Sequence, residues 1–150
     1  MKTENKTRTS ILSTIDDNKT ILVRLVVGLI FLSEGIQKYL FPELLGTGRF
    51  LKIGFSDASF WAYFTGTFEI ISGILVLIGL LTRLASIPLI IIMITAFITT
   101  KYPMLILKGF WVTAHEYRAD FALTMLLVYL FISGGGKWSV DLMINKSKKT

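Results

Sequence analysis

Four long apolar segments constrain this chain more than any other feature of its sequence. They run from about Ile21 to Phe41, from Phe60 to Leu81, from Leu84 to about Met104, and from about Tyr117 to Gly134. Each approaches the ~20 residues that an α-helix needs to cross ~30 Å of hydrocarbon. Because backbone groups in lipid must be satisfied within their own segment, all four are expected to be helices. The sequence therefore predicts an all-α integral membrane protein, an antiparallel bundle of four transmembrane helices.

The composition agrees with a bilayer as the solvent. Hydrophobic residues make up 53% of the 150 residues and charged residues only 17%, below the quarter that is usual in soluble domains. The chain has no cysteine and one histidine, His115. These counts exclude disulfides, iron–sulfur clusters, and a bis-histidine haem within one protomer, and no metal site is predicted. A redox cofactor would therefore be a mobile molecule such as a quinone, or would belong to a partner.

The chain is divided into a polar segment at 1–20, a membrane domain at 21–141 and a basic tail at 142–150. The net charge of +6 is interpreted as topological information and not as a nucleic-acid interface. Six of the 16 Lys and Arg residues lie on the side opposite the termini, and the other ten lie on the terminal side. Because basic loops favour the cytoplasm, both termini are expected to be cytoplasmic. The ten basic residues on the terminal side are Lys2, Lys6, Arg8, Lys19, Arg24, Arg83, Lys137, Lys146, Lys148 and Lys149.

Small residues in the first two segments predict where those helices pack. Gly28 and Gly35 are seven residues apart, and so are Gly66 and Gly73. Seven residues make about two helical turns, so each pair lies on one stripe of its helix. Close backbone approach is what holds helices together in lipid. The stripes are therefore interpreted as a packing seam and not as ligand contacts.

Ionisable residues within the apolar segments form the candidate site. Glu34 and Lys38 make an i,i+4 pair in the first segment, and Glu69 is the only charged residue of the second. Counted from the outer ends of their segments at the helical rise, Glu34 lies roughly 10 Å deep and Glu69 roughly 14 Å deep. Both carboxyls thus fall in one layer of the membrane. Charged groups at such depth usually face the bundle interior and find partners there.

The fourth segment is expected to add charges to this layer. Its uncharged run from Phe121 to Gly136 spans roughly 24 Å of helix, which is too short to cross alone. The helix must begin earlier, and its first turns then bring charged residues to the outer boundary. Arg118 is expected to clamp Glu34 or Glu69 there. The candidate ligand-binding residues are Glu34, Lys38, Glu69, His115, Glu116, Arg118 and Asp120.

Two interpretations of this charged cluster stay open. In the first, it binds a quinone or another small polar ligand, or relays protons, because intramembrane charges are usually functional. Arg118 or His115 would then donate to a carbonyl oxygen, and a carboxyl would relay protons. In the second, it is a mutually satisfied ion network that fixes the register of the helices in a non-catalytic scaffold or small-solute carrier.

Aromatic residues in and after the loop between the first two segments bear on the scaffold interpretation. They are either a docking face for a partner or an interfacial belt at the lipid surface. The residues are Phe50, Phe55, Phe60 and Trp61.

Three motifs follow one another along the chain. The first segment carries R-x3-G-x5-EG-x2-K from Arg24 to Lys38, and the second carries E-x3-G-x5-GL-x-TR from Glu69 to Arg83. The closing stretch, HEYRADF followed by GGGKWSVD, runs from His115 to Asp141. Through these motifs, about Ile21 to Asp141 resembles the DoxX family of small bacterial membrane proteins. The resemblance implies a four-helix protein of the bacterial inner membrane.

The resemblance also implies a link to redox chemistry. Some related proteins are subunits of a thiosulfate:quinone oxidoreductase, and many have no assigned activity. The chain is accordingly expected to be a membrane subunit or accessory protein of a quinone-linked system, with no covalently bound cofactor and no activity on its own. Its expected partners are the lipid bilayer, a redox subunit and a second copy of the chain. The family supplies no agreed catalytic residues, so the site above rests on physical reasoning alone.

Overall fold

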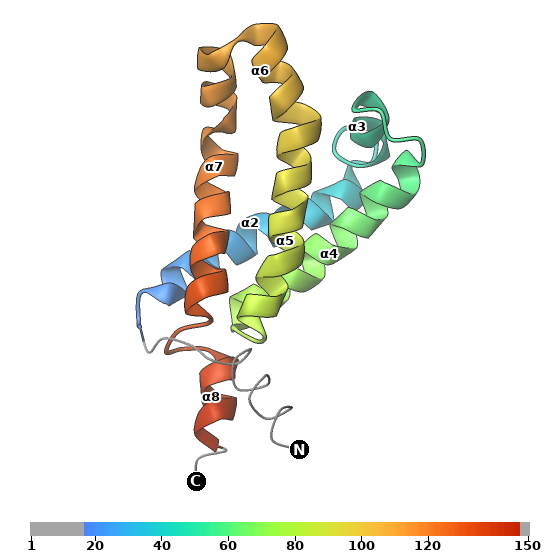
Figure 1. Ribbon diagram of the computed structural model, residues 1–150. Helices are drawn as coiled ribbons and strands as arrows, with labels where there is room; N and C mark the ends of the chain where they lie inside the picture. The colour runs from blue at the N-terminus through green and yellow to red at the C-terminus, as the bar shows by residue number, and fades with distance from the viewer. Residues whose placement is uncertain (1–16, 148–150) are drawn as a thin grey trace, which may run out of the picture.

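The computed structural model describes residues 17–147, and every regular element within this range is helical (Figure 1). The all-α class is thereby confirmed. Residues 1–16 and 148–150, which belong to the predicted polar segment and basic tail and include half of the ten terminal-side basic residues, lie outside the described residues. The helices are α2 (Thr20–Leu40), α3 (Thr47–Lys52), α4 (Ala58–Ile78), α5 (Thr82–Ala96), the π-helix η1 (Phe97–Lys101), α6 (Tyr102–Lys108), α7 (Phe110–Ser133) and α8 (Val140–Ser147).

Three helical stretches of the described chain are long and apolar enough to cross a membrane. They are α2, α4 and the continuous stretch Thr82–Lys108 formed by α5, η1 and α6. The 24-residue α7 is the fourth long helix, and it runs back beside α5 (Figure 1). Charged residues in its first half make it less apolar than the other three. The arrangement agrees with the predicted four-helix bundle.

The predicted bounds of the second and third segments leave only Thr82 and Arg83 to connect them, and the structure places this connection earlier. The turn lies at 79–81, where Gly79 and Leu81 adopt left-handed backbone angles with φ of +71° and +50°. Glycine adopts this conformation without the steric cost that a Cβ brings. The carboxylate of Asp141 accepts hydrogen bonds from the backbone N–H groups of Leu81 and Thr82 at 2.7 and 3.1 Å. This cap begins α5 at Thr82, a residue that the sequence pattern had assigned to the turn.

The predicted glycine packing seam is confirmed, and the structure places it between α2 and α4. A Cβ added at Gly35 would lie 2.7 Å from the carbonyl oxygen of Gly66, and one at Gly73 would lie 2.9 Å from the backbone nitrogen of Leu32. Real Cβ atoms do not approach other atoms this closely, so the two backbones are in direct contact. The same close approach occurs at Gly28, which faces Gly73 and Leu77.

The two ends of the bundle differ in how tightly they are packed. We define the terminal end as the start of α2, the end of α4, the start of α5, the end of α7 and α8. The distal end consists of α3, η1, α6 and the first half of α7. All four long helices contribute to the apolar core, and its members include Phe31, Val76, Leu89 and Leu127, each at most 3% exposed. By contrast, η1 and α6 have no buried residue.

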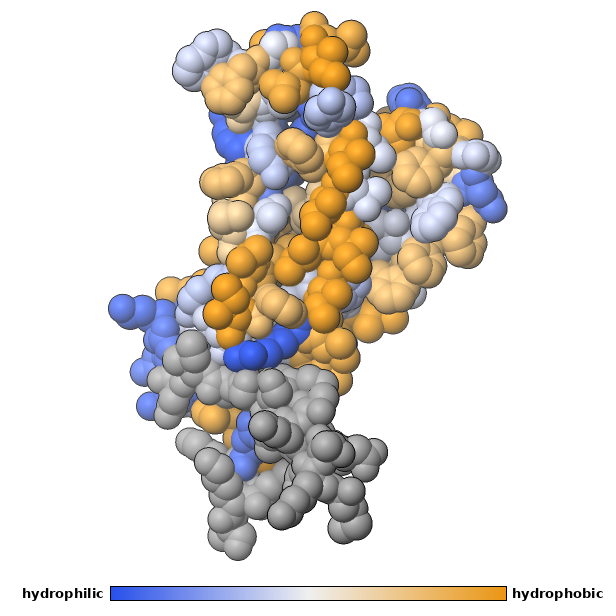
Figure 2. Space-filling model, viewed as in Figure 1, coloured by the Kyte–Doolittle hydropathy of each residue, from blue (hydrophilic) through white to orange (hydrophobic). Residues whose placement is uncertain are grey.

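Exposed apolar side chains cover the outer faces of the long helices. On the face shown in Figure 2, hydrophobic side chains run along the helices, and hydrophilic ones gather toward the ends of the molecule. The exposed residues include Leu29 at 56% and Ile91 at 57%. Such a surface is suited to contact with lipid and unsuited to contact with water.

Candidate functional site

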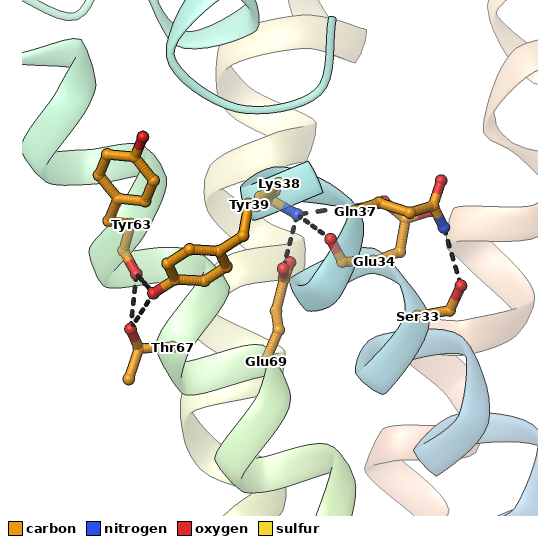
Figure 3. Close-up of polar contacts among 8 residues, drawn as sticks. All are labelled: Ser33, Glu34, Gln37, Lys38, Tyr39, Tyr63, Thr67 and Glu69. Carbon is orange, nitrogen blue, oxygen red and sulfur yellow. Dashed lines mark hydrogen bonds and ion pairs between the residues drawn. The ribbon is translucent and has the colours of Figure 1, made fainter. Parts of the chain in front are cut away.

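The centre of the site is an ion pair between α2 and α4 (Figure 3). The Nζ atom of Lys38 lies 2.5 Å from Oε2 of Glu69, and the two side chains are 8% and 5% exposed. Lys38 lies three residues after Gly35, and Glu69 lies three residues after Gly66, so each charge shares a face with a seam glycine. The backbone contact at the glycines therefore brings both charges into the interface between the helices.

A second carboxyl lies beside this pair. Oε2 of Glu34 is 4.0 Å from Nζ of Lys38, and the Glu34 side chain is 44% exposed. Lys38 also donates a hydrogen bond of 3.5 Å to the backbone oxygen of Glu34. One ammonium group thus faces two carboxyl groups, of which only that of Glu34 is open to its surroundings. We call Glu34, Lys38 and Glu69 the inner cluster.

Neutral polar groups flank the inner cluster on two sides (Figure 3). On one side, Nε2 of Gln37 donates to Oγ of Ser33 at 2.8 Å, and both residues belong to α2 beside Glu34. On the other side, the hydroxyl oxygen of Tyr39 is 2.6 Å from Oγ1 of Thr67, and the hydroxyl donates to the backbone oxygen of Tyr63 at 3.1 Å. The inner cluster therefore lies within a band of polar groups that crosses both helices.

The structure places the charged residues of α7 in a separate group beside η1. Oδ2 of Asp120 pairs with Nζ of Lys101 at 3.2 Å, and Lys101 also donates to the backbone oxygen of Glu116 at 3.1 Å. Nη1 of Arg118 lies 3.1 Å from Nδ1 of His115. We call these five residues the π-helix cluster. Within residues 17–147, none of them forms an ion pair with the inner cluster.

The expected clamp of Arg118 on Glu34 or Glu69 is therefore wrong. The reason is the path of the helices: α2 and α7 meet at the terminal end, where Oγ1 of Thr20 is 3.1 Å from the hydroxyl of Tyr129, and they separate toward the distal end (Figure 1). Arg118 lies eleven residues before Tyr129, about three turns along the same face of α7. Its side chain is exposed and contacts His115 of its own helix, away from the interface between α2 and α4.

Lys101 belongs to the π-helix cluster, and the sequence analysis missed it. It is the last residue of η1, seven residues before the distal end of the third membrane stretch, Thr82–Lys108. A proline two residues later, Pro103, lacks the N–H that would bond to Thr99, and its ring crowds the carbonyl of that residue. A π-turn accommodates this interruption, and such turns are frequent at functional sites. In the sequence, Pro103 inside an apolar segment was the feature that could have indicated an interrupted helix at Lys101.

We expect Lys101→Met to destabilise the protein by about 1 kcal/mol or less. The carboxyl of Asp120 is 35% exposed, so it can be solvated when its partner is removed. Thermal unfolding in detergent would measure the change, with Lys108→Met as the matched control, because Lys108 is an exposed lysine of the adjoining α6. A loss above about 2 kcal/mol relative to this control would show that the cluster is a buried network and not an exposed pair.

A second buried polar centre lies at the terminal end and was also missed. The guanidinium of Arg24, a residue 3% exposed, donates to the backbone oxygens of Val76 at 2.9 Å, Leu77 at 2.5 Å, Gly135 at 3.0 Å and Trp138 at 2.7 Å. Together with the Asp141 cap on α5, these bonds join α2, α4, α5 and the segment at 135–141. Arg24 and Asp141 both belong to the motifs that carry the DoxX resemblance, which was the available signal.

The fold and the inner cluster together define a class of protein. Several apolar helices of membrane-spanning length, packed through a glycine seam around a buried lysine–glutamate pair, form a helical-bundle membrane protein in contact with lipid. The chain belongs to the DoxX family, whose sequence model matches residues 20–102. The matched range covers α2 to η1 and contains the whole inner cluster. The resemblance stated from the motifs is therefore confirmed.

Two relatives match most of the chain. "Uncharacterized membrane protein Rv3486" of Mycobacterium tuberculosis is 47% identical over 132 residues, which cover 84% of this chain and 81% of that protein. "Putative oxidoreductase CatD" of Bacillus subtilis is 33% identical over 131 residues, which cover 87% of this chain and 90% of that protein. No solved structure matches the chain.

Proposed function

We propose that this DoxX-family protein is a membrane subunit or accessory protein of a quinone-linked redox system, and that the inner cluster binds the quinone head group. The observation that carries the proposal is the exposed carboxyl of Glu34 beside the buried Lys38–Glu69 pair. A quinone needs a donor at its carbonyl oxygen, and it takes up two protons with two electrons when it becomes a quinol. Lys38 is a suitable donor, and Glu34 is a suitable group for proton exchange.

Apolar surface next to the inner cluster suits the tail of a quinone. Val26 and Ile30 lie seven and three residues before Ser33, on the same side of α2, and they are 46% and 37% exposed. The stripe thus changes from apolar to polar where it reaches Ser33 and Glu34. Quinones have the same division between an isoprenoid tail and a polar head, and binding pockets of this kind combine apolar walls with a few polar groups.

The electrons would come from a partner subunit. The chain has no cysteine and one histidine, so it has neither thiol chemistry nor a pair of haem ligands of its own. The name of the Bacillus subtilis relative, "Putative oxidoreductase CatD", agrees with this class of function. The proposal also places the protein in the bacterial inner membrane with both termini in the cytoplasm, on the basis of the excess of basic residues on the terminal side.

The test is quinone binding by the purified protein, using a short-chain water-soluble quinone. We expect Glu69→Gln to weaken binding at least tenfold, because the neutral amide removes the nearer of the two carboxylates that hold the ammonium of Lys38 in place, and the ammonium is then free to shift toward Glu34. Binding would be measured by titration in detergent, with Glu43→Gln as the matched control, since Glu43 is exposed in the loop after α2. Equal quinone affinity in Glu69→Gln and the unmodified protein would refute the proposal.

A structural ion network is the second candidate, and the burial of the Lys38–Glu69 pair favours it. A buried ion pair can often be replaced by apolar residues without loss of stability. The double variant Lys38→Met with Glu69→Leu therefore separates the two candidates. A folded double variant that no longer binds quinone supports the quinone site. If the unmodified protein does not bind quinone, the structural ion network is favoured, and the unfolding temperature of the double variant then measures how much the pair contributes to stability.

A further inference from the structure

We propose that the terminal end of the bundle holds a binding site for the phosphate group of an anionic phospholipid. A pocket of about 360 Å³ lies between the end of α4 and the segment that leads into α8. It is separate from the inner cluster, so this inference does not depend on the quinone proposal. The pocket is lined by Ile78, Lys137, Trp138, Ser139, Val140 and Met143.

Hydrogen bonds hold both walls of the pocket in place. Arg24 donates to the backbone oxygen of Trp138 on one wall and to that of Leu77, the residue before Ile78, on the other. The backbone N–H of Asp141 donates to the oxygen of Gly79 at 3.0 Å, which ties the same two segments together again. The pocket is therefore formed before a ligand arrives, and little conformational freedom is lost on binding.

Two donors at this pocket have no partner among the described residues. The ammonium of Lys137 and the indole N–H of Trp138 make no hydrogen bond or ion pair with the side chains described for residues 17–145, and Trp138 is 69% exposed. Two acids of this end that the structure describes already have hydrogen-bond partners: Asp141 accepts two backbone N–H groups, and Asp17 accepts the backbone N–H of Lys19. A cation and a neutral N–H donor suit the oxygens of a phosphate group.

The rest of the lining favours a lipid as the source of the phosphate. Ile78 is the last residue of a membrane-spanning helix and is 44% exposed, and Met143 on α8 is 70% exposed. Apolar side chains therefore adjoin the two donors, as acyl chains adjoin a headgroup. Tryptophan and lysine are typical of the boundary between hydrocarbon and headgroups. Exposed or half-exposed Lys19 and Arg83 make this end more basic still.

The test is native mass spectrometry of the full chain in detergent micelles, titrated with phosphatidylglycerol or with phosphatidylcholine of the same acyl chains. We expect phosphatidylglycerol to bind at least fivefold more tightly. Lys137→Gln should weaken phosphatidylglycerol binding roughly fivefold, the effect of one lysine near an anionic membrane surface. Trp138→Phe keeps the aromatic ring and removes the N–H, so it should weaken binding as well.

The matched control is Lys108→Gln, which removes an exposed lysine at the distal end and should leave binding unchanged. Lys137 is exposed, so its replacement should leave the helical circular dichroism signal unchanged. Equal weakening by Lys137→Gln and Lys108→Gln would overturn the proposal, because it would show attraction to the overall charge and not to this pocket. Equal binding of the two lipids by the unmodified protein would also overturn it.

Discussion

Arg24→Met should lower the free energy of unfolding by roughly 3–5 kcal/mol. The guanidinium is almost completely buried and donates to the backbone oxygens of Val76, Leu77, Gly135 and Trp138. Methionine has a similar volume but no donor, so these oxygens would lose their partners. A buried polar group without a partner costs about 1–3 kcal/mol, and water that reaches part of the site would offset some of that cost.

The measurement is thermal unfolding in detergent, followed by circular dichroism. Arg49→Met is the matched control, because Arg49 lies exposed on α3 and its side chain makes no hydrogen bond or ion pair with the described part of the chain. Arg24→Lys should fall between the two, since one ammonium keeps the charge but has too few donors for four carbonyls. The account of Arg24 is wrong if Arg24→Met and Arg49→Met unfold at the same temperature.

Gly35→Leu should destabilise the contact between α2 and α4 by about 3 kcal/mol. A Cβ at this position would lie 2.7 Å from the oxygen of Gly66 and 3.0 Å from the backbone nitrogen of Ile70. Backbone atoms cannot rotate away as the end of a side chain can, so the helices would have to separate. Separation would also pull Lys38 away from Glu69, because both follow the seam glycines by three residues.

Val26→Leu is the matched control for this enlargement, because Val26 lies on the same helix with 46% of its surface exposed. Its unfolding temperature should stay close to that of the unmodified protein, whereas Gly35→Leu should unfold at a lower temperature or fail to accumulate in the membrane. Gly35→Ala adds a single methyl group and should show a smaller effect in the same direction. Similar behaviour of Gly35→Leu and Val26→Leu would contradict direct backbone contact at the seam.

The sequence located the first membrane helix almost to the residue, and its errors elsewhere have identifiable causes. The predicted 21–41 compares with Thr20–Leu40 in the structure. The second segment was predicted to run to Leu81, but α4 ends at Ile78. Apolar residues continue through Leu80 and Leu81 although the backbone has already turned at Gly79. An apolar residue is expected to lie in an apolar environment, but its hydrophobicity does not indicate whether its backbone is still helical.

The inner cluster shows what depth along a helix can predict. Glu34 and Glu69 were expected in one layer of the membrane, and the structure brings both to the ammonium of Lys38. The same counting led to the expectation that Arg118 would pair with Glu34 or Glu69, and the structure does not show this pair. Depth follows from counting residues at a constant rise, whereas proximity also requires that two helices face each other.

The sequence by itself determined that the protein lies in a lipid bilayer, that it is helical, roughly where its long helices lie, and which glycines form the packing seam. Each of these follows from local composition and from the period of the α-helix. Only the tertiary structure decided that the charged residues form two clusters and that Arg24 and Asp141 close the terminal end. Both outcomes depend on the angles at which the helices cross. Those angles result from the packing of all four helices together, and no single segment encodes them.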